Sequence, residues 1–480
     1  MKPITGFILF FLACLPLAEL AAFDPQTSLV EIEVTKKDYD YRMPWISRNE
    51  QVRKNGILIG EKQILTTADG LSDQYLCRVR KGGESRQYTA ELVWVDFYAN
   101  VAILDVSEPG FWEGMQAVAL AQGIPQSGKL QIYRWRGGRI EERAAEIIRL
   151  SSGSSKMSYL RHLVLTVSST IESAGWAEVV FDGEELVGLT ASSAKDRLNI
   201  LPIEFIMKVI ERHSIEEGSG LGYFDFKTMS AKNPALPASK GLDRRDVGVV
   251  VTEVGGKGLA EGGLIIGDII LEVDGFEIDS AGKYVDPEYG RLGMSSLATR
   301  SHGAGESMPF KVWRAGKLQV IDYTLPPVDF EKDFIPDHRY NQAPQYLMAG
   351  GLVFQPLDGP LLRVLGKNKP VLLDYYSQQK GMDDRSGLVV LSGVLPDDYN
   401  LGYEDIRYAL VDQINGRMIG EIKDVEAALQ ESEGGFHRIR FMPEEGVRQI
   451  VLDAGALDRA TARILQNYRI PSASQLGVGE

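Results

Sequence analysis

The chain has 480 residues, a length that predicts about three domains instead of a single core. It is 44% hydrophobic and 25% charged, which is the composition of a globular protein. The net charge of −14 disfavours nucleic acid and anionic membrane surfaces as its main partners.

Residues 1–22 predict a cleaved export signal, because Lys2 precedes the apolar run FILFFLACLPL and small residues follow as far as Ala22. The run is short for a bilayer span, and a retained N-terminal anchor is the alternative. Beyond it we expect no integral membrane domain. Cleavage leaves Cys77 as the single cysteine, which excludes an internal disulfide. We therefore expect an exported, periplasmic protein.

Residues 28–213 predict an all-β barrel region followed by a closing helix. Short apolar or alternating runs are separated by Gly, Asp, Lys and Ser, as barrel strands require. These runs are SLVEIEV, NGILIG, KQILTT, YLCRVR, YTAELVWV, NVAILDV, HLVLTV and EELVGLT. The segment PIEFIMKVIERHS then has apolar residues at helical spacing.

The second half of the chain contains an internal repeat. GVVVTEV is followed by GGLIIGDIILEVDGFEI, and further on GLVVLSGV is followed by IRYALVDQINGRMI. Each copy has an apolar strand, a connection, a second strand and a DG or NG hairpin turn. We expect two related small domains at residues 214–328 and 346–480, joined by a polar, proline-bearing linker at 329–345.

GGLIIGDIILEVDGFEI resembles the core of a PDZ domain, a fold that binds an extended peptide as an added strand. In PDZ domains a glycine-containing loop before the first strand holds the peptide carboxylate. The resemblance implies that GLGYFDF is this loop in the first copy and AGGLVF in the second. An ordinary turn leading into a strand is the alternative. The implied peptide-binding residues are Leu221, Gly222, Tyr223, Phe224, Gly350, Gly351, Leu352 and Val353.

A barrel followed by two PDZ-like copies on an exported chain resembles the HtrA/Deg family of trypsin-like serine proteases. Four segments are similar to the plant-type branch with two PDZ domains, and they are DYDYRMPW, FWEGM, NLGYEDI and YRIPSA. The resemblance covers nearly all of the mature chain. It implies a mainly β fold, in which a trypsin-like double β-barrel precedes two α+β PDZ domains.

The family's catalytic triad occurs in the order His, Asp, Ser, and each side chain has a separate task. ILTTAD places Asp69 at the histidine position. DFYANVAIL keeps Asp96 but places Asn100 at the aspartate position, and ESAGWAEVVFDG places Ala174 at the serine position. Glu172 replaces a glycine of the oxyanion loop, where a carboxylate repels developing negative charge. All three triad positions are therefore changed.

The first histidine of the chain is His162, so no earlier residue can act as a histidine base. A divergent endopeptidase is the alternative, with Ser173 as nucleophile and His162 or a lysine as base. A shift of one residue would bring Ser173 to the nucleophile position. The five histidines lack paired metal-ligand spacing, and no phosphate-binding glycine loop with a lysine occurs. We expect neither a metal nor a cofactor.

These patterns predict an exported pseudo-protease whose PDZ domains bind unfolded or C-terminal peptide segments of envelope proteins. Family members assemble as trimers through aromatic residues near the start of the barrel, which implies Tyr39, Tyr41 and Trp45 as oligomer contacts. Partners would be further copies or an active Deg homologue. The alternative assigns these aromatics to the protomer's own core. A third hypothesis is a structural assembly protein, with Tyr223 and Phe224 packed into a closed groove.

Overall fold

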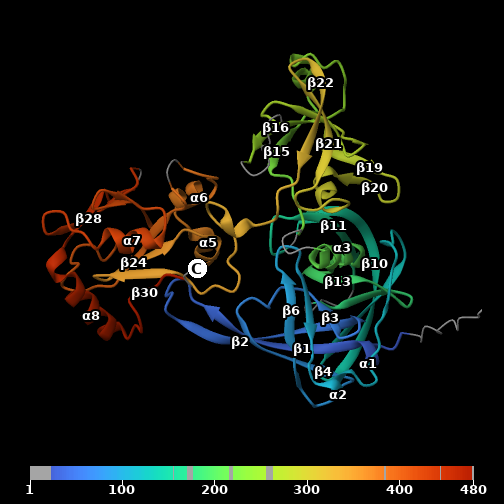
Figure 1. The fold of residues 1–480 in the computed structure, drawn as a ribbon, viewed down its shortest axis with the longest axis horizontal. Helices are drawn as coiled ribbons and strands as arrows, with labels where there is room; N and C mark the ends of the chain where they lie inside the picture. Colours follow the sequence, from blue (N-terminus) through green and yellow to red (C-terminus); the bar gives the residue numbers. More distant parts are fainter. Residues whose placement is uncertain are drawn as a thin grey trace, which may run out of the picture.

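The structure is a computed structural model that describes residues 23–154, 156–169, 177–215, 220–255, 263–382, 385–443 and 445–477. The predicted export signal and the positions Glu172, Ser173 and Ala174 lie outside these residues. Figure 1 shows three bodies: a blue-to-green barrel, a green-to-yellow body above it and an orange-to-red body beside it. Within the described ranges, no helix is both long and apolar enough to cross a bilayer.

The first half of the barrel is a seven-stranded antiparallel sheet in the order β5-β4-β1-β2-β3-β7-β6. Alternation of apolar residues drives its formation, because Val30, Ile32 and Val34 lie on one face of β1 and are fully buried. Its strands are β1 (Leu29–Tyr39), β2 (Ser47–Gly60), β3 (Gln63–Thr66), β4 (Gln74–Lys81), β5 (Tyr88–Thr89), β6 (Glu91–Asp96) and β7 (Val101–Asp105). The predicted runs from SLVEIEV to NVAILDV all fall within these strands or overlap them.

The second half of the barrel is another seven-stranded sheet, in the order β12-β9-β10-β11-β14-β13-β8. β12 also pairs with β13, so this sheet closes on itself. Its strands are β8 (Ala119–Leu120), β9 (Lys129–Arg136), β10 (Arg139–Ser154), β11 (Arg161–Ser168), β12 (Val179–Asp182), β13 (Glu185–Ala194) and β14 (Arg197–Pro202). One apolar cluster joins the two halves, since Ile57 and Leu65 share it with Val179 and Leu189.

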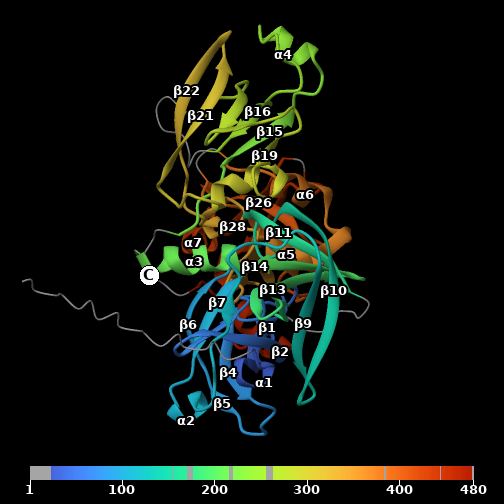
Figure 2. The same ribbon diagram turned by 90° about the vertical axis from the view of Figure 1, so that its right-hand side faces the viewer.

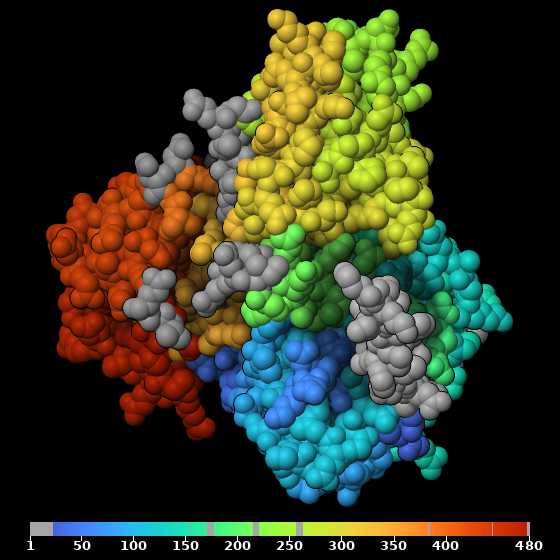
Figure 3. Space-filling model, turned by 45° about the vertical axis from the view of Figure 1, so that its right-hand side comes forward, coloured from blue at the N-terminus to red at the C-terminus, as the bar shows by residue number. Residues whose placement is uncertain are grey.

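The predicted closing helix is α3 (Ile203–Ile215), which lies between the barrel and the upper body (Figure 2). In the space-filling view, green atoms fill the space between the yellow body and the blue-to-cyan barrel (Figure 3). Arg212 of this helix forms an ion pair with Glu306 of the upper body. Two short helices, α1 (Pro25–Ser28) and α2 (Pro109–Trp112), complete the barrel.

The upper body contains a sheet in the order β15-β16-β17-β21-β22, with β15 at an edge. Asp274 and Gly275 have φ angles of 49° and 82°, which confirms the predicted DG hairpin turn. The elements are β15 (Phe226–Ser230), α4 (Ala235–Ser239), β16 (Val249–Val254), β17 (Ile269–Val273), β18 (Phe276–Glu277), β19 (Lys283–Asp286), β20 (Gly290–Gly293), η2 (Met294–Thr299), β21 (Ser307–Arg314) and β22 (Lys317–Thr324).

The orange-to-red body is built on a sheet in the order β29-β28-β26-β25-β24-β23-β30. Asn415 and Gly416, with φ angles of 50° and 76°, form the predicted NG turn. The strands are β23 (Tyr346–Ala349), β24 (Leu352–Pro356), β25 (Val389–Val394), β26 (Ala409–Ile414), β27 (Arg417–Met418), β28 (Phe436–Phe441), β29 (Gln449–Asp453) and β30 (Ser474–Gln475). The helices are α5 (Gly359–Leu365), η4 (Gly366–Asn368), α6 (Val371–Ser377), α7 (Ile422–Ala428), η5 (Ala454–Ala456) and α8 (Leu457–Tyr468).

The segment 329–345, which we expected to be a linker, packs against the barrel. It begins with the short helix η3 (Phe330–Lys332), whose Phe330 is buried. The Tyr340 ring stacks on Phe97 with 4.3 Å between the ring centroids, and its hydroxyl donates to the carbonyl oxygen of Met157. Buried aromatic side chains therefore hold this segment as a strap across the barrel, which its polar composition did not indicate.

Candidate functional site

The structure brings the first two changed triad positions together. Thr66 at the end of β3 is paired with Ala102 near the start of β7, so Asp69 and Asn100 lie side by side just beyond these strands. The backbone N–H of Asp69 donates to Asn100 Oδ1 at 2.8 Å. Both residues are buried, with exposed fractions of 4% and 1%.

A lysine that the sequence analysis missed lies beneath Asp69. Lys54 on β2 is buried, and its Nζ donates to the Asp69 carbonyl oxygen at 2.7 Å and to Thr67 Oγ1 at 3.1 Å. It also donates to the Thr67 carbonyl oxygen and lies 3.8 Å from Asp69 Oδ1. Burial lowers the pKa of Lys54 to about 8. Since Val52, Lys54 and Leu58 share one face of β2, strand alternation in the sequence is a signal that could have found it.

The Asp69 carboxylate is held by three side chains. Its Oδ1 accepts from the Thr67 hydroxyl at 2.5 Å, its Oδ2 lies 3.6 Å from Lys156 Nζ, and Lys54 is the third partner. A carboxylate fixed between two ammonium groups accepts hydrogen bonds and cannot carry a proton between nucleophile and leaving group as an imidazole does. The corner that would hold the catalytic base is therefore a buried ion-pair network.

Asp96, the retained aspartate, supports the turn that carries Asn100. Its Oδ1 accepts from the backbone N–H of Ala99 at 2.8 Å. Burial raises the pKa of Asp96. Asn100 itself has a φ of 60°, a left-handed conformation that Asn and Asp tolerate better than most residues. Asp96 thus shapes the turn.

His162 lies on β11 and is 3% exposed. Its Nδ1 is 2.8 Å from the Leu163 carbonyl oxygen, and its ring stacks on Phe205 with centroids 4.5 Å apart. Burial lowers the pKa of His162 to about 4, so the imidazole is neutral near pH 7. Its Nε2 is buried and has no hydrogen-bond partner among the residues that the structure describes.

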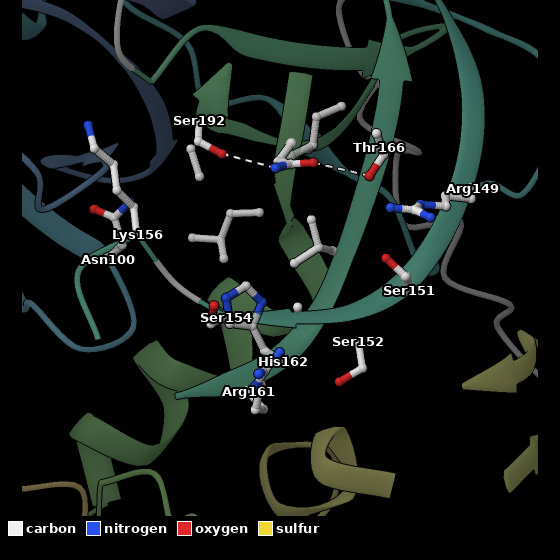
Figure 4. Close-up of a pocket in the computed structure, with 16 residues that line it drawn as sticks. Asn100, Arg149, Ser151, Ser152, Ser154, Lys156, Arg161, His162, Thr166 and Ser192 are labelled. Carbon is white, nitrogen blue, oxygen red and sulfur yellow. Dashed lines mark hydrogen bonds between the residues drawn. The ribbon is translucent and has the colours of Figure 1, made fainter. Parts of the chain in front are cut away.

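A cavity of about 300 Å³ joins His162 to Asn100 (Figure 4). In the figure, Asn100 and Lys156 lie on one side, Arg149 and Ser151 on the other, and His162 at the bottom. The remaining polar lining comes from Ser152, Ser154, Arg161, Thr166, Ser192 and Asn199. We call this space the polar cavity.

The predicted carboxylate loop of the first PDZ copy is joined to the residues just before the strap. Leu221 is buried, Gly222 forms an antiparallel bridge with Pro327, and the Tyr223 N–H donates to the Pro326 carbonyl oxygen. Phe224 is half-buried and packs on Phe226, Phe310 and Tyr323. Part of the loop is therefore occupied by contacts with other residues of the same chain. The neighbouring strand β15 has one edge without a strand partner among the described residues.

The structure contradicts the expected peptide loop at Gly350, Gly351, Leu352 and Val353. The two glycines have φ angles of 57° and 88° and form the tight turn between β23 and β24. β24 is paired with β23 on one side and β25 on the other, so it offers no edge to a peptide. The Gly350 N–H already donates to Thr461 Oγ1. The glycine pattern of a hairpin turn was mistaken for that of a carboxylate loop.

The aromatic residues predicted as oligomer contacts occupy the tip between β1 and β2, which reaches the orange-to-red body (Figure 1). Tyr41 packs against the apolar cluster that includes Leu361 and Leu373, and the Trp45 ring lies 6.0 Å from that of Tyr346. Both side chains therefore have partners within the chain. Tyr39, at the end of β1, is half-buried.

Comparisons with known proteins agree with this architecture. A protein-family model described as a PDZ domain matches residues 335–475. "Putative protease Do-like 12, mitochondrial" from Arabidopsis thaliana is 25% identical over 93% of this chain and 86% of the relative. "Protease Do-like 4, mitochondrial" from the same plant is 24% identical over 90% of this chain and 82% of the relative. The chain is a homologue of the HtrA/Deg proteases.

A solved structure titled "HtrA-type protease AlgW with decapeptide" is similar in fold. The match covers 63% of this chain and 95% of the solved chain, with 17% sequence identity and a TM-score of 0.46. The HtrA/Deg relatives and the PDZ match, together with the two seven-stranded sheets of the barrel, confirm the predicted mainly β fold class.

Proposed function

We propose that this chain is an exported pseudo-protease of the HtrA/Deg family that captures unfolded polypeptide through its first PDZ domain. The observation that carries the proposal is the state of Asp69, which is fixed by Lys54, Lys156 and Thr67 where a catalytic histidine would stand. Asn100 beside it cannot stabilise an imidazolium as an aspartate does. The barrel then acts as a scaffold, in a chaperone-like or regulatory role.

Strand addition at β15 is the binding mode that we propose for the polypeptide. β15 is an edge strand of the PDZ sheet, and Lys227, Met229 and Ser230 along it are exposed. Main-chain hydrogen bonds supply affinity in this mode without requiring one sequence, which suits capture of unfolded chains. The second PDZ domain takes a different role, because both neighbours of its strand β24 belong to the chain itself.

Hydrogen exchange with and without a reduced, carboxymethylated unfolded protein tests this binding mode. Amides of β15 (Phe226–Ser230) should become protected, while those of β24 (Leu352–Pro356) should not change. The matched control is a pair of peptides of one sequence, one unmodified and one N-methylated at alternate residues. The N-methylated peptide cannot add as a strand. Equal protection by the N-methylated and unmodified peptides, or protection at neither strand, would refute capture at β15.

A divergent endopeptidase that uses Ser173 is the second candidate. The observation that favours it is His162, which lines the same cavity as Asn100 and whose buried Nε2 has no hydrogen-bond partner among the described residues. Against it, a neutral imidazole with a pKa near 4 is a weak base at neutral pH. A turnover assay with the Ser173→Ala variant separates the two candidates.

Export through residues 1–22 to the periplasm and assembly as a homo-oligomer, or together with an active Deg homologue, complete the proposal. The relatives named above are described as mitochondrial, so the compartment rests on the signal pattern of this chain alone.

A further inference from the structure

A short segment of the chain itself covers one edge of the second PDZ domain's sheet. Its strand β30 runs antiparallel to β23, with Ser474 facing Leu347, and the Met348 N–H donates to the Ala473 carbonyl oxygen at 2.7 Å. The other neighbour of β23 is β24, so β23 would be an edge strand without β30. We call residues 472–477 the covering segment. It lies on the sheet as an added strand, which is the mode in which PDZ domains bind peptides.

One large apolar side chain fastens the covering segment to the domain. Leu476 is half-buried and packs against the apolar cluster that contains Leu347 of β23 and Val425 of α7. Ser472 and Gln475 are exposed. In strand addition the main chain supplies affinity and side-chain pockets supply selectivity. The edge of β23 therefore asks of its occupant an extended main chain and a leucine, and little else.

The chain just before the covering segment is anchored separately. The Ile470 N–H donates to the Leu465 carbonyl oxygen at 2.9 Å, and the Ile470 side chain is 6% exposed. Pro471 follows it and is exposed. A two-residue strand at the rim of a sheet opens at a lower free energy than the core of the domain. We therefore expect the covering segment to leave β23 while α8 and the rest of the domain stay folded.

We propose that the edge of β23 is a polypeptide-binding site, which the covering segment occupies until a leucine-bearing extended segment of a captured polypeptide replaces it. An unfolded polypeptide meets both requirements of the site, because it offers unpaired main-chain groups and exposed apolar side chains. This inference rests on the proposed function of polypeptide capture and adds a second site to it. The new site lies in the second PDZ domain, whereas β15 belongs to the first.

Two variants uncover the edge of β23, and a third is their control. A truncation that ends at Pro471 removes the covering segment, and Leu476→Asp places a charge where Leu476 packs on the core. Leu401→Asp makes the same substitution in the second PDZ domain at a leucine that is 67% exposed, so it should leave the covering segment in place. In the parent the site is free only in the fraction of molecules whose covering segment has opened, which weakens the apparent affinity for a peptide.

Fluorescence anisotropy with a labelled peptide of residues 471–477, PSASQLG, measures binding at the site. We expect both uncovered variants to bind it at least about tenfold more tightly than the parent and Leu401→Asp do. The Leu476→Asp peptide should bind the uncovered variants at least about tenfold more weakly than PSASQLG. Equal affinity of the parent and the uncovered variants, or of the two peptides, would overturn the proposal. Binding at β15 would be the same in all these proteins, so failure here leaves capture at β15 standing.

A third peptide separates captured polypeptides from a second copy of this chain as the source of the ligand. It keeps the leucine in place but replaces the residues around it with threonine and asparagine. Binding that matches PSASQLG supports captured polypeptides, because the site then reads only the main chain and the leucine. Binding of PSASQLG alone would assign the site to a second copy of this chain and contradict the proposal.

Hydrogen exchange places the peptide on β23. The Met348 amide, which donates to Ala473 in the parent, should exchange faster in both uncovered variants and become protected again when PSASQLG is added. Protection elsewhere with no change at Met348 would count against the site. Loss of the second PDZ domain's melting transition in both uncovered variants would also refute the proposal, since the covering segment would then be part of the core.

Discussion

At the scale of single residues, Lys54 and Asp69 depend on each other. The Lys54 ammonium group satisfies two carbonyl oxygens, a hydroxyl oxygen and a carboxylate in a space where water has no access to it. Removing one member of such a buried pair costs more than the pair contributes, because the remaining charge and acceptors stay buried.

We predict that Lys54→Met lowers the free energy of unfolding by about 3–5 kcal/mol in urea titration. Lys156→Met is the matched control, because Lys156 also pairs with Asp69 but is about half exposed, at 49%. Its effect should stay below about 1 kcal/mol. Similar losses in the two variants would show that Asp69 does not depend on the buried lysine.

Because of His162, the stability of the barrel should depend on pH. In the folded chain burial lowers its pKa to about 4, below the usual value of 6.5, so the unfolded chain binds more protons between these pH values. The contribution of His162 to the free energy of unfolding is then fully present above pH 6.5. It is lost as the pH falls toward 4, by about 3 kcal/mol. We would measure the free energy of unfolding in urea at several pH values for the parent and for His162→Phe. It should depend less steeply on pH in the variant. Equal slopes would mean that His162 is not buried as described.

At the scale of elements, the turn between β23 and β24 has little space for side chains. A Cβ on Gly351 would lie 2.4 Å from Asn400 Nδ2 and 2.5 Å from the Leu395 carbonyl oxygen. The turn is therefore fixed both by its positive φ angles and by its neighbours.

We predict that Gly351→Ala lowers the melting temperature of the second PDZ domain. Its free energy of unfolding should fall by about 2–4 kcal/mol. Gly416→Ala in the NG turn is the control, since Gly416 has a φ of 76° but open space around it, and it should cost only about 1–2 kcal/mol. Differential scanning calorimetry of both variants measures the difference. Equal costs would show that the neighbours of Gly351 can move aside.

The elements could largely be predicted from the sequence, whereas their partners could not. The DG and NG turns at Asp274 and Asn415 carry a local conformational signal, and both hairpins form where expected. The internal repeat did not specify the order of the strands in the sheet, so the pairing of β24 with β23 was not expected. The glycines at 350–351 were therefore assigned to a carboxylate loop, whereas they form the turn between these two strands. Likewise, Tyr340 belongs to a polar segment and becomes buried only because Phe97 offers a ring to stack on.

At the scale of the whole molecule, the tip between β1 and β2 links the barrel to the second PDZ domain. Arg42 donates to the Val364 carbonyl oxygen at 3.0 Å, and Trp45 packs with Tyr346. We predict that Trp45→Ala loosens this contact within one chain. Small-angle scattering should then show a larger radius of gyration, while light scattering should give an unchanged molar mass. Dissociation to a smaller mass would instead assign Trp45 to an oligomer contact.

The central claim is that the barrel has lost its chemistry, and turnover of a dye-labelled unfolded protein tests it most directly. The purified mature chain should be compared with its Ser173→Ala variant and with an active HtrA/Deg protease as positive control. We predict no cleavage by either form of this chain, because Asp69, Asn100 and Ala174 supply neither base nor nucleophile. Cleavage by the parent that disappears in Ser173→Ala would contradict the claim and show that the barrel has built a new catalytic site.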